Sequence, residues 1–350
     1  MNKKYLSILS NLKKEDYKER NPNDKILLID GLNTFIRAYT VNPTMNDHGV
    51  HIGGIGGFLL SIGYAIKMLK PTRVIICFDG KGGSAKRRKI FPEYKANRRV
   101  KKQITRFNSI MTRNEEKAAM HYQLHRLTEY LAVLPVTVMA PENIEADDAI
   151  AYLTQQIYPE SKCVIMSSDK DFLQLTTDRV QVWSPTKKKL YFKDDILEDF
   201  GVPNHNFLTY RLMKGDSSDN IPGVKGTGVK TLMKSLPILF GDKKITVDDI
   251  IEYTTKNNKS KINQRLSESR DILELNYDLM QLDEVDIHGI AKGEVMEIAR
   301  DKIPLLVKFK FLTMMLEDST NASIKNPELW LKQVFAHLNA MAMKREEDDR

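Results

Sequence analysis

The chain has 350 residues, of which 41% are hydrophobic and 29% are charged, proportions typical of a folded protein rather than a disordered one. Its formal net charge of +8 favours a polyanionic partner. No apolar run reaches the roughly 18–20 residues that a membrane span needs, and two cysteines are too few for a disulfide framework, so we expect no membrane association and a reducing compartment.

Five β-branched or apolar runs predict strands, at residues 26–30, 73–79, 135–140, 162–169 and 179–183. Helical patterns separate the first four, which predicts βαβ crossovers and an α/β fold with a mostly parallel sheet flanked by helices. The run 179–183 and the sequence KKLYF that follows it predict a hairpin at the sheet edge. Beyond about residue 200 the strand patterns stop and helical segments continue. We therefore predict an N-terminal extension at 1–24, an α/β core at 25–200, a helical domain at 201–340 and a tail at 341–350.

Seven carboxylates follow predicted strands or open a predicted helix, and two more open the second half of the chain. The carboxyl ends of the strands are where parallel sheets bind their ligands. Each alone is compatible with a helix cap or with a charge that complements a helix dipole. Together on one rim they would repel one another, so the pattern predicts bound hard cations, Mg²⁺ or Mn²⁺ rather than zinc, in a two-ion site for phosphoryl transfer. The nine are Asp30, Asp79, Glu145, Asp147, Asp148, Asp169, Asp171, Asp216 and Asp219.

Residues 81–106 hold eleven Lys and Arg side chains and a single acid, Glu93, a net charge of +10 that exceeds that of the whole chain. Such a concentrated basic segment beside an acidic site predicts binding to nucleic acid, with a solvated loop as the alternative interpretation. The later sequence IPGVKGTGVKTLMKSL predicts a second phosphate-binding element. Its glycines permit a tight turn whose N–H groups can approach phosphate, and its lysines add positive charge; the residues are Gly223, Lys225, Gly226, Gly228 and Lys230.

The ordered blocks IDGLN, CFDG, RRKIFPEYKANR, IEADDAI, SSDKDFLQL and KGDSSDNIPGVKGTGVKT resemble the flap endonuclease, or structure-specific 5′-nuclease, family between about residues 24 and 300. The resemblance is greatest to the bacteriophage ribonuclease H type and to the 5′-nuclease domain of bacterial DNA polymerase I. It implies a PIN-like nuclease core, a helical arch at about 81–125 and a helix–hairpin–helix at about 216–236, which in related nucleases often holds K⁺.

The resemblance also assigns roles to individual residues. Asp30, Asp79, Glu145 and Asp147 would hold one metal ion, Asp169, Asp171, Asp216 and Asp219 would surround the second, and Asp148 would act partly through its neighbours. Lys95 and Arg98 would reach the scissile phosphate, and Arg88 matches another basic position that contacts DNA.

The implied activity is a monomeric, metal-dependent 5′→3′ exonuclease and flap endonuclease acting on DNA flaps, nicks, forks and RNA·DNA hybrids during primer removal. We expect a cytoplasmic enzyme, in the host cytoplasm if a phage encodes it. A non-catalytic binder of branched DNA and an RNA-cleaving enzyme of the related single-domain fold are the alternatives. Residues 1–12 have apolar side chains at helical spacing, which fits packing on the core or a sliding-clamp tether, and the C-terminal helices are a candidate contact for single-strand-binding protein.

Overall fold

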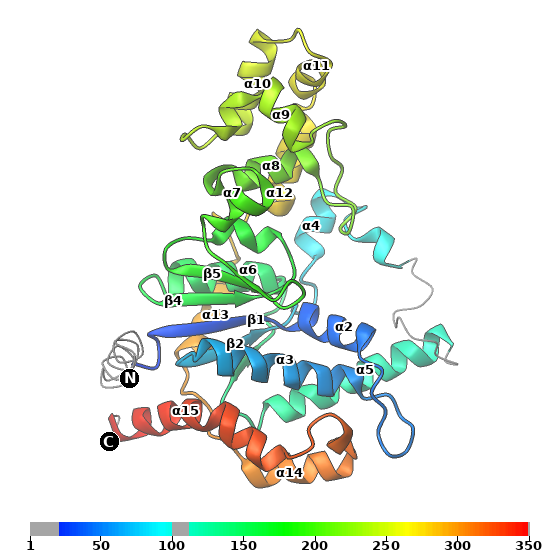
Figure 1. The fold of residues 1–350 in the computed structure, drawn as a ribbon, viewed down its shortest axis with the longest axis vertical. Coiled ribbons are helices and arrows are strands. Elements are labelled where there is room, and N and C mark those ends of the chain that lie inside the picture. The colour runs from blue at the N-terminus through cyan, green and yellow to red at the C-terminus, as the bar shows by residue number, and fades with distance from the viewer. Residues whose placement is uncertain (1–20, 100–111, 349–350) are drawn as a thin grey trace, which may run out of the picture.

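The computed structural model describes residues 21–99 and 112–348 and contains a six-stranded sheet in the order β3-β2-β1-β4-β5-β6 (Figure 1). The first five strands are parallel and β6 pairs antiparallel with β5, so both the predicted α/β class and the predicted edge hairpin are confirmed. The strands are β1 (Lys25–Asp30), β2 (Arg73–Cys77), β3 (Thr137–Met139), β4 (Lys162–Met166), β5 (Val180–Ser184) and β6 (Lys189–Tyr191).

Helices cover both faces of the sheet because the central strands are apolar on both sides. In β1, Leu27 and Ile29 face one layer while Ile26 and Leu28 face the other, and all four are fully buried. The first layer contains α2 (Gly31–Val41), α3 (Gly53–Leu69) and α5 (Arg113–Leu131). The second contains α6 (Ala146–Tyr152), η2 (Leu153–Ile157), η3 (Asp171–Leu175) and α7 (Asp195–Phe200).

A separate apolar cluster holds together the helices that lie above the sheet in the upper half of Figure 1. Leu212, Leu232, Leu266 and Leu273 are buried in it. Tyr94 also joins this cluster, so the chain after α4 (Ala85–Ile90) packs against the helical region. The helices are α8 (Phe207–Lys214), α9 (Val229–Ser235), α10 (Val247–Lys256), α11 (Lys261–Ser267) and α12 (Arg270–Met280).

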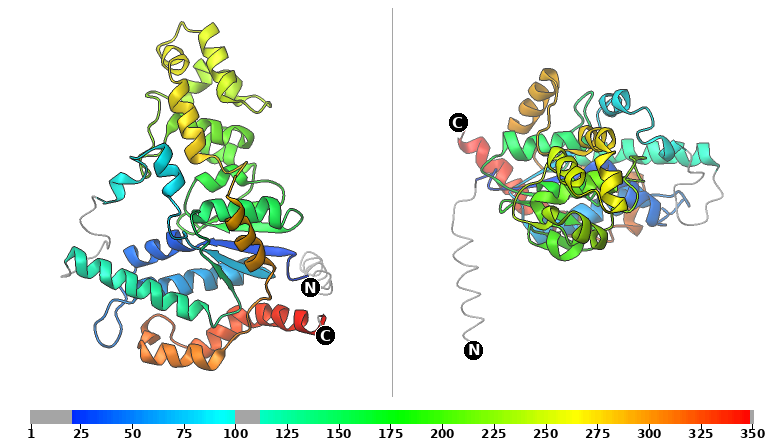
Figure 2. Two further views of the ribbon diagram at one scale, coloured as in Figure 1. Left: turned by 180° about the vertical axis from the view of Figure 1, so that it is seen from behind. Right: turned by 90° about the horizontal axis from the view of Figure 1, so that it is seen from above.

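The last three helices return to the sheet, which differs from the predicted assignment of residues 201–340 to one helical domain. Ala291 and Val295 of α13 (Gly289–Arg300) are buried in the second layer. Residues of α14 (Lys308–Glu317) and α15 (Pro327–Asp348) are buried in the first layer, beneath α3 and α5 (Figures 1 and 2). The cause is the set of large apolar side chains in these helices, which need the α/β core to cover them.

The predicted N-terminal extension and the predicted C-terminal tail differ in how far the structure describes them. The N-terminal extension falls almost wholly on residues 1–20, outside the described residues. The predicted tail is helical as far as Asp348, as the continuation of α15. Within the described chain, no helix is both long and apolar enough to cross a bilayer.

Candidate metal and nucleic-acid site

Strand ends bring the first carboxylates together at the rim of the sheet. Asp30 ends β1 and caps α2, with its Oδ1 accepting the Asn33 N–H at 3.0 Å and its Oδ2 accepting the Ser167 hydroxyl at 3.0 Å. Asp79 follows the neighbouring β2 and accepts the Ala146 N–H at 2.9 Å, which ties it to the start of α6. The carboxyl ends of adjacent parallel strands therefore place these acids beside one another, as the sequence predicts.

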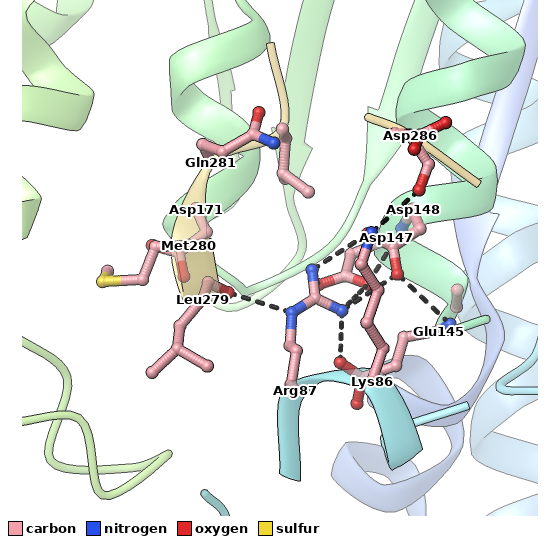
Figure 3. A network of polar contacts seen from close by, with 12 residues as sticks. Lys86, Arg87, Glu145, Asp147, Asp148, Asp171, Leu279, Met280, Gln281 and Asp286 are labelled. Carbon is pink, nitrogen blue, oxygen red and sulfur yellow. Dashed lines mark hydrogen bonds and ion pairs between the residues drawn. The ribbon is translucent and has the colours of Figure 1, made fainter. Parts of the chain in front are cut away.

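The acidic turn of α6 surrounds a buried arginine. Glu145 is the N-cap, and Asp147 and Asp148 lie in the first turn. The guanidinium of Arg87, from α4, contacts Glu145 Oε2 at 2.5 Å and both oxygens of Asp148 at 2.9 Å (Figure 3). Lys95 also binds this turn, donating to Glu145 Oε1 at 2.5 Å.

A second arginine links the remaining acids of the rim. The backbone N–H of Asp171 donates to Asp169 Oδ1 at 2.9 Å, and the two carboxylates after β4 are close enough to repel one another. Arg211 of α8 bonds Asp171 Oδ1 at 2.8 Å and Asp216 Oδ2 at 2.6 Å through the same nitrogen. The helical region thereby joins the rim of the sheet.

Asp219 connects the rim to the basic segment. Its side chain accepts a hydrogen bond from Arg98, and its carbonyl oxygen accepts the Lys95 N–H at 2.8 Å. Lys95 has a φ of 59°, a left-handed conformation that is uncommon for a residue with a side chain. The described start of the predicted arch is therefore anchored directly against the acidic site.

Burial and crowding change the pKa values of several acids. Burial raises the pKa of Asp30 to about 7, with Asp169 and Asp79 adding repulsion, and burial beside Asp169 raises the pKa of Asp171 to about 7 as well. The pKa values of Asp147 and Asp219 are also raised by burial. Burial opposes ionisation of Glu145 too, yet Arg87 and Lys95 hold its pKa at about 2.

The donor set fits hard divalent cations. Every predicted ligand is a carboxylate, the ligand type that hard divalent cations prefer. In the part of the chain that the structure describes, no three Asp, Glu, His or Cys side chains are arranged to hold a metal as they stand. Arginine and lysine nitrogens instead pair with carboxylates of the rim.

The helix–hairpin–helix predicted at about residues 216–236 covers the loop that follows α8 and the helix α9. The loop is compact because the Val224 N–H bonds the Met213 carbonyl at 2.8 Å and the Thr227 hydroxyl bonds the same carbonyl at 3.1 Å. Gly226 has a φ of +99°, which favours glycine. The other predicted residues of this element are exposed on its surface: Gly223, Lys225, Gly228 and Lys230.

The structure describes the basic segment, residues 81–106, only up to residue 99, and it describes the rest of the predicted arch from residue 112 onward. Arg88 lies exposed on α4, and the Arg98 side chain is 52% exposed. The basic residues Lys101, Lys102 and Arg106 lie outside the described residues.

Sequence reasoning missed Arg87 and Arg211 as parts of the site. Arg87 was counted only within the basic segment, and Arg211 has no motif around it. A signal for Arg87 was its place in RRKIFPEYKANR, one residue from Arg88. Tyr94 also joins the site, since it is 3% exposed and its hydroxyl donates to Glu145 at 3.1 Å.

Solved structures share this architecture. The 5′-exonuclease of bacteriophage T5 superposes with a TM-score of 0.63 at 23% identity, covering 79% of this chain and 98% of that one. Flap endonuclease-1 from Methanococcus jannaschii gives a TM-score of 0.51 at 15% identity, covering 91% and 94%. These superpositions show a common fold.

Sequence comparisons identify the family. The 5′–3′ exonuclease of Bacillus subtilis is 32% identical over 258 residues, which cover 70% of this chain and 80% of that protein. The DNA polymerase I of Bacillus subtilis is 28% identical over 254 residues, 71% of this chain but 26% of the polymerase. A family model for the 5′–3′ exonuclease N-terminal resolvase-like domain matches residues 25–201. The chain therefore belongs to the 5′–3′ exonuclease family.

Proposed function

We propose that this protein is a divalent-metal-dependent, structure-specific 5′-nuclease that hydrolyses phosphodiester bonds near 5′ ends. The observation that carries the proposal is the contact of Lys95 with Glu145 and of Arg98 with Asp219. Groups that bind phosphate and groups that bind metal thus share one rim at the carboxyl ends of the strands.

Two ions, Mg²⁺ with Mn²⁺ as a substitute, would supply an activated water and stabilisation of the leaving oxygen. The first would be held by the acids nearest α6 and the second by those nearest α8. The proposed first set is Asp30, Asp79, Glu145 and Asp147, and the second is Asp169, Asp171, Asp216 and Asp219. Asp148 would contribute through Arg87, which it binds with both oxygens.

The chain's own cations would bind and orient the scissile phosphate. Lys95 and Arg98 are both paired with acids of the rim. When a phosphate enters the site, a phosphate oxygen would replace the carboxylate as the partner of each cation. Their positive charge would stabilise negative charge developing on that phosphate as water attacks in line. The products would carry a 5′-phosphate and a 3′-hydroxyl.

The proposed substrates are DNA with a 5′ flap, nick or fork, and RNA·DNA hybrids. The exposed Arg88, Lys225 and Lys230 would bind the backbone without reading sequence, and K⁺ at the hairpin is part of this proposal. Support comes from fold neighbours described with DNA, among them a T5 flap endonuclease with DNA and metal ions and the catalytic core of Rad2 with a DNA substrate. The similarity to DNA polymerase I supports a role in RNA primer removal during replication.

Contacts with a sliding clamp and with single-strand-binding protein are a further part of the proposal. The candidate clamp segment, residues 1–12, lies outside the described residues. Deleting it should abolish stimulation of cleavage by the clamp while leaving unstimulated cleavage intact; unchanged stimulation would remove the clamp from the proposal.

The decisive experiment compares wild type with Asp169→Asn on a 5′-labelled flap, a nicked duplex and an RNA-primed duplex, with Mg²⁺ or EDTA. We expect Mg²⁺-dependent release of short 5′ products by wild type, and their loss in the variant with binding retained. Tight binding of branched DNA by wild type without cleavage in Mg²⁺ or Mn²⁺ would instead identify a non-catalytic binder.

A further inference from the structure

Glu145 has two cationic partners whose surroundings differ sharply. Its Oε2 accepts from Arg87 and from the Tyr94 hydroxyl, while its Oε1 accepts from Lys95 and from the Ser84 hydroxyl at 2.6 Å. Four donors therefore hold both oxygens of a carboxylate that the proposed function assigns to a metal ion. At least one donor must leave when that ion binds.

Arg87 is built into the protein. The residue is 6% exposed, and its Nε donates to the Leu279 carbonyl of α12 at 2.9 Å while its two terminal nitrogens bind the acids of α6. Figure 3 shows the guanidinium between Leu279 on one side and Asp147 and Asp148 on the other. One side chain thus connects α4, α6 and α12, and moving it would remove the buried cation that contacts Glu145, Asp147 and Asp148.

Lys95 makes fewer contacts than Arg87. Its ammonium donates to a single carboxylate, Glu145, at 2.5 Å and lies 4.8 Å from the Tyr94 ring, and its side chain is 14% exposed against 7% for Arg87. A lysine has a flexible stem and a compact charge, so it can exchange one oxygen partner for another at small cost. A DNA phosphate would offer it such a partner.

We propose that Arg87 is the positioning residue of the acidic turn, fixing Glu145 and Asp148 in the loaded and unloaded site alike, whereas Lys95 is a removable partner of Glu145. This inference rests on the proposed nuclease function and deepens it. It assigns opposite effects on metal affinity to two cations that contact the same carboxylate.

The test measures Mn²⁺ binding to DNA-free protein by calorimetry, together with thermal unfolding in EDTA, for Arg87→Met, Arg87→Lys and Lys95→Met. Lys86→Met is the matched control, because Lys86 is the neighbouring residue on α4 and donates to the Asp286 carbonyl rather than to a carboxylate of the rim. Flap cleavage is then followed against Mn²⁺ concentration to separate metal affinity from the maximal rate.

Arg87→Met should weaken Mn²⁺ binding roughly tenfold or more, as loss of a group that orients metal ligands does, and should lower the unfolding temperature in EDTA. Arg87→Lys should recover part of the affinity, and Lys86→Met should bind like wild type. Lys95→Met should bind Mn²⁺ more tightly than wild type yet keep a low maximal rate when Mn²⁺ saturates.

Three results would overturn the inference. A folded Arg87→Met that binds Mn²⁺ as tightly as wild type would show that Arg87 only stabilises the fold. If Arg87→Met does not fold, wild-type Mn²⁺ affinity in Arg87→Lys would likewise show that Arg87 only stabilises the fold. Weaker Mn²⁺ binding by Lys95→Met would show that Lys95 is not a competitor. In each case cleavage by wild type would leave the proposed function standing, whereas wild type that neither binds Mn²⁺ nor cleaves would remove the proposed function itself.

Discussion

Arg211 of α8 and Asp171 of η3 form a buried ion pair that joins the helical region to the rim of the sheet. Two guanidinium nitrogens approach Asp171 Oδ1 at 3.0 and 2.8 Å, and one of them also reaches Asp216 Oδ2 at 2.6 Å. The Arg211 and Asp171 side chains are 9% and 18% exposed. Asp171 and Asp216, two acids of the second proposed metal group, therefore depend on a residue from outside the sheet for their neutralisation.

Replacing Arg211 by Met should destabilise the metal-free protein by about 3–5 kcal/mol, because Asp171 and Asp216 would lose their cation while staying in the rim. Urea unfolding in EDTA at neutral pH measures the change. Lys214→Met, at the exposed last position of the same helix, is the control and should cost little. Equal losses for the two variants would show that the Arg211 ion pairs contribute nothing specific.

The strands of the sheet can be predicted from the sequence because each strand pattern is contained in a few consecutive residues. Short apolar runs such as residues 26–30, alternating with helical patterns, favour strands of a parallel sheet, and an acid at the end of such a strand lies at its carboxyl edge. Asp30 and Asp79 follow from this rule alone. The other acids of the site were assigned from the order along the chain of the sequence motifs that contain them.

Partners from distant segments could not be predicted in the same way. Arg87 meets the carbonyl oxygen of Leu279, and Arg211 meets Asp171, across separations that no periodicity encodes. The return of α14 and α15 to the sheet was missed for a related reason: an amphipathic helix shows that it has an apolar face but not which surface covers that face. Phe311 and Phe335 supply that face here, and both are fully buried in the first layer.

Phe335→Ala tests whether α15 is part of the α/β core. The ring is fully buried and packs edge-on against Trp330 at a centroid distance of 5.4 Å, so its removal should cost about 3–5 kcal/mol through lost burial and a cavity. Denaturant unfolding measures the loss, and the exposed Lys332→Ala on the same helix is the control. A change below 1 kcal/mol, on the order of an ordinary surface substitution, would contradict the packing.

Asp199→Asn tests the charge cluster that closes the β5–β6 hairpin onto α7. Hydrogen bonds from Lys189 at 2.9 Å and Tyr191 at 2.7 Å lower the pKa of Asp199. A lowered folded pKa stabilises the protein above the unfolded pKa of about 3.9, and this stabilisation is lost as the pH falls through the folded value. The substitution should therefore cost less than about 1 kcal/mol at neutral pH, and nothing once the pH is below the folded pKa.

Unfolding by urea at several pH values measures that difference. Glu198→Gln, which also removes one negative charge from α7, is the control. A cost for Asp199→Asn that stays constant down to the lowest pH would show that its carboxylate charge is not the cause.

Gly226→Ala tests the hairpin that follows α8. With φ at +99°, an alanine there should cost about 1–2 kcal/mol by forcing the loop to rearrange, although its Cβ would meet only ordinary contacts with Arg265 and Ile262. Gly228→Ala has φ at −69° and open space around the added Cβ, so its effect should be smaller. Affinity for duplex DNA and thermal unfolding are both measured, and equal effects of the two variants would contradict a special role for the turn.

Replacing Lys225 and Lys230 tests whether the hairpin binds the DNA backbone. Both are exposed, and each phosphate contact should contribute about 0.9 to the slope of log affinity against log salt concentration. The double variant Lys225→Gln, Lys230→Gln should therefore bind more weakly to all duplex sequences and show a slope smaller by about 2. Lys332→Gln, on α15 beneath the sheet, removes a charge on another face and should leave the slope unchanged. An unaltered slope in the double variant would mean that DNA does not contact the hairpin through these lysines, and that the arch and the rim supply the measured salt dependence.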